Sequence, residues 1–376
     1  MAEITKKIGG FFTNKVEKMK SKITNGVTNY KALTGKEKAK WWQEFLLNNA
    51  IYIIFILFIM YVWIYCLVVQ NANFLSSSSI MDLINKTAYS SFLALGVGGI
   101  IVLTGTDLSA GRILGLTACI SAALLQRADW SNKMFPNIDP LPMFVVLMIV
   151  VAIGASIGFV NGFFTAKFKM HPFIVTLGTQ LIVYGLTLMF VNSGNNGGVA
   201  INGLTDAYTN LIKGSVSLGG VSIPYYVFYA AIAIVVMWFI WNKTTLGKNM
   251  FAVGANPEAA HVSGVSVFWT TIIVFVIAGA LYGISGFVEA ARVGSNSAST
   301  GANAELNAIA ACVIGGVSFS GGVGKISGII AGVVLLNLVT VGLQWLGLAP
   351  YYTSIITGLI IIFAVAVDMR KYIAKK

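Results

Sequence analysis

The side chains that could carry acid–base or metal chemistry are few in this sequence and lie far apart. It has two histidines, His171 and His261, and long apolar stretches separate them. The nearest approach to a phosphate-binding loop, residues 322–326, lacks the upstream glycine and the Ser or Thr that should follow its lysine. We therefore expect no metal site, no catalytic triad and no ATP hydrolysis in this chain. The sequence is not predicted to be an enzyme.

Acidic residues near the apolar stretches are scarce as well. Asp107, Glu289 and Glu305 lie closest to the predicted membrane depth, and Glu289 is placed to pair with Arg292 on the same helix face. Transport driven by a proton or sodium gradient usually needs titratable groups inside the membrane. Their scarcity predicts that the energy for any uphill transport comes from outside this chain.

The composition points to a membrane protein. Of the 376 residues, 57% are hydrophobic and 10% are charged, which leaves too few polar side chains to cover a soluble domain. Ten apolar windows are close to the length of about 20 residues that a membrane-spanning helix needs. Seven are continuous and three are interrupted by Gly, Ser and Thr: 48–69, 142–166, 172–192, 224–242, 268–288, 326–346 and 351–367, then 87–104, 111–127 and 304–318. Continuous runs favour helices over a barrel, so the predicted fold is an all-α polytopic membrane protein with about ten spans.

The basic residues predict an orientation. With ten spans both termini fall on one side, and most of the basic residues behind the net charge of +12 fall there too. That side holds the ten lysines of residues 1–47, four basic residues after position 369, and Arg112, Lys167, Lys169, Lys243, Lys248 and Lys325. The opposite side holds Lys86, Arg127, Lys133, Lys213 and Arg292. Because Lys and Arg are enriched in cytoplasmic loops, both termini are predicted to be cytoplasmic.

This orientation also suggests how the chain is divided. Residues 1–47 form a basic cytoplasmic or interfacial tail, 48–368 the transmembrane domain and 369–376 a second basic tail. Clustered lysines beside apolar spans are typical of attraction to the anionic lipids of a bilayer. A nucleic-acid partner is not expected, because the chain has no separate folded basic domain.

Glycine spacing predicts close helix packing. Gly154, Gly158 and Gly162 make two consecutive GxxxG steps, and single steps recur at Gly111/Gly115, Gly279/Gly283 and Gly328/Gly332. Glycine lets two helix backbones approach closely in lipid. Asn161 lies beside the double step and would be costly against lipid, so we expect it to face a neighbouring helix or a polar path.

Two Gly/Ser/Thr-rich breaks, residues 104–111 and 315–324, interrupt the shorter spans. They share a loose G-x-[DS]-x-S pattern, which suggests two related halves, although two ordinary tight loops would look similar. Non-helical backbone is tolerated in a membrane only where it is buried or lines a cavity. The candidate path or gate residues are Thr106, Asp107, Ser109, Asn161, Glu289, Ser318 and Ser320. The sequence leaves open whether residues 291–303 re-enter the membrane.

The polar stretch 243–267 contains the signals of one short capped helix. Asn256 is a suitable N-cap, Pro257 suits the first helical position, Glu258 favours the positive helix end, and Gly264 suits the position after the last turn. Small side chains, Ala259 among them, would allow this helix to dock into a groove of a partner. A simple surface turn is the alternative.

Five segments of the chain resemble a known family: 105–112, 161–162, 172–179, 247–260 and 307–324. Together they are similar to the permease subunits of bacterial ABC sugar importers of the ribose/galactose group, and most of all to those for galactose and methyl galactoside. The resemblance covers roughly residues 45 to 376. The chain departs from the family pattern in its long lysine-rich N-terminal tail and in His171, where threonine is usual.

The resemblance implies a set of partners. It implies two copies of the permease around a central path in the bacterial cytoplasmic (inner) membrane, two cytoplasmic subunits that bind ATP and Mg²⁺, and an extracytoplasmic sugar-binding protein. No cofactor is implied for this chain itself. The stretch 243–267 would contact the ATPase, and the long polar loop 193–223 is a candidate docking surface for the binding protein. The candidate ATPase-coupling residues are Gly247, Lys248, Asn256, Pro257, Glu258, Ala259, Ala260 and Gly264.

The predicted function is therefore import of galactose, methyl galactoside or a related monosaccharide by alternating access. A carrier or channel for small polar solutes that works without an ATPase is the alternative, and a membrane-embedded scaffold is a third possibility. The sequence does not distinguish the preferred sugar.

Overall fold

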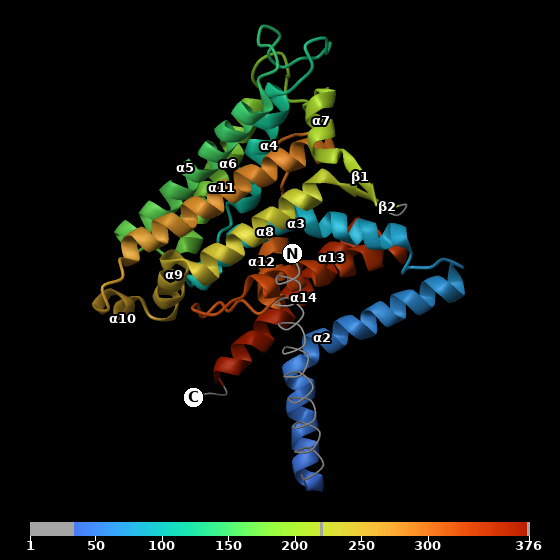
Figure 1. Ribbon diagram of the computed structural model, residues 1–376, viewed down its shortest axis with the longest axis vertical. Coiled ribbons are helices and arrows are strands. Elements are labelled where there is room, and N and C mark those ends of the chain that lie inside the picture. The colour runs from blue at the N-terminus through green and yellow to red at the C-terminus, as the bar shows by residue number, and fades with distance from the viewer. Residues whose placement is uncertain (1–33, 219–220, 374–376) are drawn as a thin grey trace, which may run out of the picture. The chain divides into compact units, whose positions relative to one another are not determined.

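The computed structural model describes residues 34–218 and 221–373 (Figure 1). The segment 1–33 and the last three residues, which include much of the two predicted basic tails, lie outside the described residues. Contacts divide the chain into two units, residues 1–57 and 58–376. Helix α2 (Gly35–Val69) begins in the first unit and ends in the second.

Helices dominate the described part of the chain. After α2 they are α3 (Ser77–Val102), α4 (Ala110–Leu124), α5 (Met143–Phe168), α6 (Pro172–Val191), α7 (Asp206–Lys213), α8 (Tyr225–Lys243), α9 (Thr245–Ala255), α10 (Pro257–Val262), α11 (Val267–Val293), α12 (Ala304–Ile314), α13 (Ile326–Trp345) and α14 (Pro350–Ile373). One antiparallel hairpin, β1 (Ser215–Leu218) with β2 (Val221–Pro224), adds a strand pair that the all-α prediction did not contain.

Five of the described helices are long and apolar enough to cross a membrane: α5, α6, α8, α11 and α13. The shorter helices α4 and α12 are also apolar, as are the segments 55–69 of α2 and 351–360 of α14. The chain is thus a mostly helical protein with several candidate spans. The count of ten spans remains a prediction.

Several predicted windows differ from the helices at their ends. The window 87–104 is too short, because α3 starts at Ser77, where the Ser76 side chain accepts a hydrogen bond from the Ser79 amide and caps the helix. The window 304–318 is too long, because α12 ends at Ile314, and Gly316 then takes a φ of +82°. The window began only at residue 87, whereas serine is a strong helix-capping residue and starts the helix earlier.

The core of the second unit is built around α11, which packs against α5, α4 and α3 (Figure 1). The predicted glycine contacts are confirmed where α5 crosses it. A Cβ atom at Gly154 would overlap the carbonyl oxygen of Gly279, and one at Gly158 would overlap that of Phe275. Gly283 in turn lies against the backbone of Val150. The glycines on both helices therefore bring the two backbones into direct contact.

Residues 294–303 run back into the helical bundle beside α4, in the opposite direction to that helix. The carbonyl of Ser297 accepts a hydrogen bond from the Cys119 Sγ, and Thr300 and Gly301 lie against the glycine step of α4. As a result, both α4 and α12 begin inside the bundle after a non-helical segment. Such segments are tolerated in membrane proteins where protein covers them.

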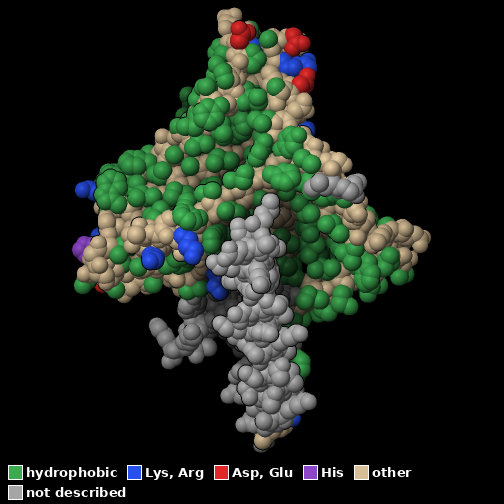
Figure 2. Space-filling view, in the orientation of Figure 1, with side chains coloured by type: hydrophobic (Ala, Val, Ile, Leu, Met, Phe, Trp, Pro, Cys, Tyr) green, Lys and Arg blue, Asp and Glu red, His purple; other side chains and the backbone are tan. Residues whose placement is uncertain are grey.

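The two ends of the second unit carry different structures, and we name them the α10 end and the α7 end. The stretch 243–267 lies at the α10 end, and most of it is helical, as α9 and α10. The predicted loop 193–223 contains α7, β1 and most of β2, which lie at the opposite end. The ring of Tyr208, fully buried, packs on Phe287 of α11 and its hydroxyl donates to the Phe287 carbonyl. In Figure 2 charged side chains gather near these two ends, and hydrophobic side chains dominate the surface between them.

Candidate functional site

The break between α3 and α4 holds a buried polar network. Asp107 is 1% exposed, and its Oδ1 accepts hydrogen bonds from the amide (2.8 Å) and the hydroxyl (2.6 Å) of Ser109. The Asn161 Nδ2 on α5 donates to the Ser109 Oγ at 3.0 Å. Three of the predicted path or gate residues are thus linked in one network. The prediction that Asn161 faces a neighbouring element is confirmed.

Two threonines of α6 complete this network, and the sequence analysis had not selected them. The Thr179 Oγ1 donates to the Asn161 Oδ1 at 2.6 Å, and the Thr176 Oγ1 accepts the Leu108 amide and donates to the Thr106 carbonyl. Thr176 and Thr179 are three residues apart, on one face of an otherwise apolar helix. This spacing could have indicated from the sequence that the two threonines face a common polar partner. The network therefore fixes the α3–α4 break to both α5 and α6.

Glu305 reaches the same region from α12. It lies in the first turn of that helix, is 3% exposed, and its Oε2 has no hydrogen-bond partner among the described residues. That oxygen lies so close to Gly111 in the first turn of α4 that a Cβ atom there would overlap it. The two helices that start inside the bundle therefore present their N-termini to one carboxylate, and the positive ends of helix dipoles favour such a group.

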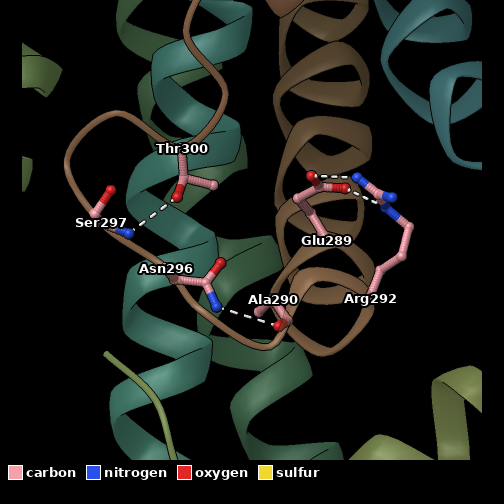
Figure 3. A network of polar contacts seen from close by, with 6 residues as sticks. All are labelled: Glu289, Ala290, Arg292, Asn296, Ser297 and Thr300. Atoms are coloured by element: carbon pink, nitrogen blue, oxygen red, sulfur yellow. Dashed lines mark hydrogen bonds and ion pairs between the residues drawn. The ribbon is translucent and has the colours of Figure 1, made fainter. Parts of the chain in front are cut away.

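Glu289 does not belong to this network. It forms a two-pronged ion pair with Arg292, with Nε–Oε2 and Nη2–Oε1 distances of 2.8 and 2.7 Å (Figure 3). The Arg292 guanidinium also lies 3.9 Å from the centre of the Tyr89 ring on α3. Figure 3 shows the chain turning just beyond, where the Asn296 side chain donates to the Ala290 carbonyl. The predicted pairing is confirmed, and it connects the end of α11 to α3.

Arg112, which the charge count assigned to the cytoplasmic side, is a residue of the helical bundle. Arg112 lies in the first turn of α4, its guanidinium 4.3 Å from the centre of the Tyr184 ring in the middle of α6, and it donates to the Ala298 carbonyl. An aromatic face and a carbonyl oxygen stabilise this cation inside the bundle.

Ser318 and Ser320 lie at the α10 end, away from the buried network. They belong to the loop between α12 and α13, in which the Ser320 amide donates to the Ser318 Oγ and the Ser318 amide to the Val323 carbonyl. A backbone hydrogen bond ties this loop to the end of α3, since the Gly322 amide donates to the Val102 carbonyl.

The capped helix predicted at 256–264 is present as α10. The Asn256 Oδ1 accepts the amides of Glu258 and Ala259, both at 3.0 Å, Pro257 is the first helical residue, and Gly264 has a φ of +83°. Ala260 faces inward, whereas Asn256, Pro257, Glu258 and Ala259 are exposed. Val262 is 87% exposed, which leaves an apolar side chain uncovered at a polar end of the protein.

The preceding residues form a second helix, α9, where only a loop was expected. Its Gly247 packs so closely on the end of α8 that a Cβ atom would overlap the Trp241 carbonyl, whereas Lys248 next to it is exposed. At its other end Gly254 lies against the Val102 carbonyl and against Gly322. The end of α9 thus contacts the end of α3 and the second break.

Thr104 connects this contact to the buried network. It is a β-branched residue with a φ of +62°, and its methyl group packs against Gly321. A side chain of this kind in the left-handed region stores strain, of the order of 1–3 kcal/mol, which neighbouring structure must support. Three residues later the chain reaches Asp107. Thr104 therefore lies between the Gly321 contact and the start of the buried network in the chain.

No group of three or more His, Cys, Asp or Glu side chains within the described ranges is placed to hold a metal ion. His171 acts as the N-cap of α6, its Nδ1 accepting the Phe173 amide, and His261 is exposed on α10. The site is consequently a buried polar network with a connection to a surface helix pair.

Comparison with known proteins identifies relatives over most of the chain. The family model described as "Branched-chain amino acid transport system / permease component" matches residues 79–365. The galactose/methyl galactoside import permease protein of Escherichia coli (strain K12) is 43% identical over 337 residues, 90% of this chain and 98% of that protein. Its counterpart in Salmonella typhimurium (strain LT2) is 42% identical over 345 residues, 92% of this chain and 99% of that protein.

A more distant relative is the ribose import permease protein of Escherichia coli (strain K12), 31% identical over 302 residues, 80% of this chain and 88% of that protein. No solved structure matches the chain. The family match begins at the third residue of α3 and covers α4 to α13 in full, and so includes both breaks, the buried network and the α9–α10 pair. The chain belongs to the family of membrane permeases described as the permease component of branched-chain amino acid transport systems.

Proposed function

We propose that this chain is the membrane-spanning permease subunit of an ATP-driven importer for galactose, methyl galactoside or a closely related monosaccharide. The observation that carries the proposal is the 42–43% identity to two galactose/methyl galactoside import permeases over nine-tenths of the chain and nearly all of theirs. The ribose permease is more distant, at 31%. The sugar is therefore assigned to the galactoside side of the group.

The α10 end is the cytoplasmic face in this proposal. Four of its lysines, Lys167, Lys169, Lys243 and Lys248, are exposed there, as expected for positive charge retained in the cytoplasm. Among the described residues of the α7 end, Lys213 is comparably exposed, whereas Lys133 is buried and Arg127 is half-buried and paired with Asp129. Ten spans with both termini in the cytoplasm fit this orientation.

Coupling to ATP hydrolysis enters through α10. A rigid six-residue helix with an intact cap, an exposed acid and an exposed valine is suited to insert into a cleft of an ATP-binding subunit. Its motion is passed through α9 to Val102, then through the strained Thr104 to Asp107 and the network with α5 and α6. Because packed helices move between discrete arrangements, this chain of contacts can alternate the access of a central path.

The remaining partners follow from the same assignment. Two copies of the chain form the path in the bilayer of the inner membrane. The surface built by α7 and the hairpin receives the extracytoplasmic sugar-binding protein, because Tyr208 and Phe287 hold that surface rigidly on α11.

Replacing Asp107 by leucine is expected to reduce sugar uptake at least about tenfold. The change leaves the Ser109 amide and hydroxyl without an acceptor in a buried site, a penalty of about 1–3 kcal/mol per group, and frees the break from its anchor. Asp107→Asn keeps an acceptor oxygen at the same position and should retain most of the activity. Initial uptake rates per inserted protein in proteoliposomes give the comparison. Equal rates for the leucine variant and the wild type would show that the network has no part in transport.

The proposed function is tested by the ATPase activity of the assembled complex. The chain is reconstituted with its ATP-binding subunits and its binding protein, and hydrolysis is measured with galactose, methyl galactoside, ribose and allose. Stimulation by the galactosides above the other sugars is expected. Stimulation by ribose alone would overturn the choice of sugar, and stimulation by none of the four would overturn the sugar-importer assignment.

A further inference from the structure

A cavity of about 240 Å³ lies between α3, α11, α12 and α13, apart from the buried network at the α3–α4 break. At about 30 Å³ for each water molecule in the liquid, it has room for roughly eight waters. This is a small ligand site, below the roughly 300–1,000 Å³ of pockets for drug-sized molecules. Its size suits one monosaccharide.

Helix α13 contributes an ordered polar face to this cavity. Val333, Asn337, Thr340 and Gln344 line it at intervals of four, three and four residues, which places them on one side of the helix. Asn337 and Thr340 are only half-buried although α13 is among the most apolar helices of the chain. Polar side chains in an apolar span usually face a protein interior or a water-filled path, where they serve a function.

The charged side chains that line the cavity, Lys86 and Glu289, are each paired. The Lys86 Nζ lies 3.2 Å from the Asp82 carboxylate and donates to the Gln344 Oε1 at 2.6 Å, which joins α3 to α13. Both oxygens of Glu289 accept hydrogen bonds from Arg292. No unpaired positive charge is left among the described lining residues to bind an anionic ligand such as a phosphate headgroup.

The rest of the lining alternates polar and apolar groups. Ser90, Asn307 and Asn337 offer hydrogen-bond donors and acceptors, while Leu93 and Leu336 provide apolar surface. A sugar presents the same two features, hydroxyl groups around its rim and C–H groups on its faces. A purely apolar or a charged ligand would match only half of such a lining.

We propose that this cavity is a low-affinity binding site for a neutral sugar within each copy of the chain. The proposal rests on the proposed function, since it adds to that function a place where the permease itself contacts its cargo. It assigns selectivity for neutral over acidic sugars to this chain, in addition to any selectivity of the binding protein.

Saturation-transfer NMR tests the site directly. The full chain is purified in detergent with its ATP-binding subunits and without the binding protein, and galactose and galacturonate are the probes. We expect transfer to galactose, none to galacturonate, and roughly tenfold weaker galactose binding in Asn337→Leu. The matched control is Asn242→Leu, because Asn242 is an exposed side chain that bonds only to Trp238 on its own helix, near the α10 end.

Thr340→Val provides a second variant in case Asn337→Leu assembles poorly. The Thr340 hydroxyl donates to the Leu336 carbonyl of the same helix, so its removal breaks no hydrogen bond between the described helices. Absence of transfer in the wild type, equal transfer in the two asparagine variants, or preferred transfer to galacturonate would overturn the site. Uptake by the complete importer is measured on the same preparations. Normal galactose uptake with no transfer overturns only the cavity, whereas transfer without uptake of any sugar overturns only the proposed function.

Discussion

Gly279→Ala is expected to lower the thermal stability of the protein by several degrees and to reduce the yield of folded protein sharply. A Cβ atom at Gly279 would overlap the Gly154 carbonyl oxygen of α5, and the same is true in the opposite direction. Neither backbone can yield without separating the most extensive helix pair of the fold. Overpacking of this kind costs about 1–3 kcal/mol or more, and two rigid backbones leave little room for relaxation.

Gly178→Ala is the matched control. Gly178 also lies within a long apolar helix, α6, but nothing lies within 4 Å of the position a Cβ atom would take. Alanine should be tolerated there and add up to about 1 kcal/mol through its higher helix propensity. Melting temperatures in detergent, together with fluorescence size-exclusion profiles, measure both variants. Equal melting temperatures would contradict the direct backbone contact between α5 and α11.

Glu258→Arg is expected to abolish sugar uptake while the protein still inserts into the membrane. Glu258 is exposed in the first turn of α10, beside the Asn256 cap, and projects from the surface proposed to enter the ATP-binding subunit. Reversal of its charge at the positive helix end costs only about 1 kcal/mol, too little to unfold the protein. The loss should therefore appear as failure to co-purify with the ATP-binding subunits and as loss of sugar-stimulated ATP hydrolysis.

Asp206→Arg is the matched control. It distinguishes the loss of binding to the ATP-binding subunits from the general cost of placing a positive charge at a helix N-terminus. Asp206 is likewise an exposed acid in the first turn of a short helix, α7, but at the opposite end of the molecule. It should co-purify with the ATP-binding subunits like the wild type. Retention of these subunits and of stimulated ATPase activity in Glu258→Arg would refute the role of α10 in coupling.

Features that depend on nearby residues were predictable from the sequence. The cap and the end of α10 needed only Asn256, Pro257 and Gly264, whose conformational preferences act within a few residues. The glycine spacing on α5 indicated a close contact, and the polarity of Asn161 indicated that it must face protein. In each case the conformational preference of a residue, or the cost of a polar group facing lipid, allows few alternative structures.

Features that depend on distant partners were not predictable in the same way. The path of residues 294–303 beside α4 follows from contacts with Cys119 and Gly115, far away in the sequence. Helix α9 was interpreted as a loop because its sequence is polar. The contact between Gly254 and Val102, which holds it against the end of α3, cannot be recognised from that polarity. The sequence carried the glycines but not the identity of their partners.

The candidate site shows the same division. Asp107, Ser109 and Asn161 were selected because polar groups beside breaks must be satisfied, and the structure links them. Thr176, Thr179 and Glu305 were not selected, since a threonine can bond within its own helix and an acid can lie at a membrane surface. Only the three-dimensional arrangement distinguishes those alternatives.

The central claim, that transport by this chain is driven by a partner ATPase, is tested most directly by uptake of labelled galactose into proteoliposomes. The vesicles contain the chain and its ATP-binding subunits, with ATP inside and the sugar-binding protein outside. We predict accumulation only when both partners and ATP are present, and none in vesicles that hold this chain alone under a sodium or proton gradient. Gradient-driven uptake by the chain alone, unaffected by ATP, would contradict the account and identify a secondary carrier.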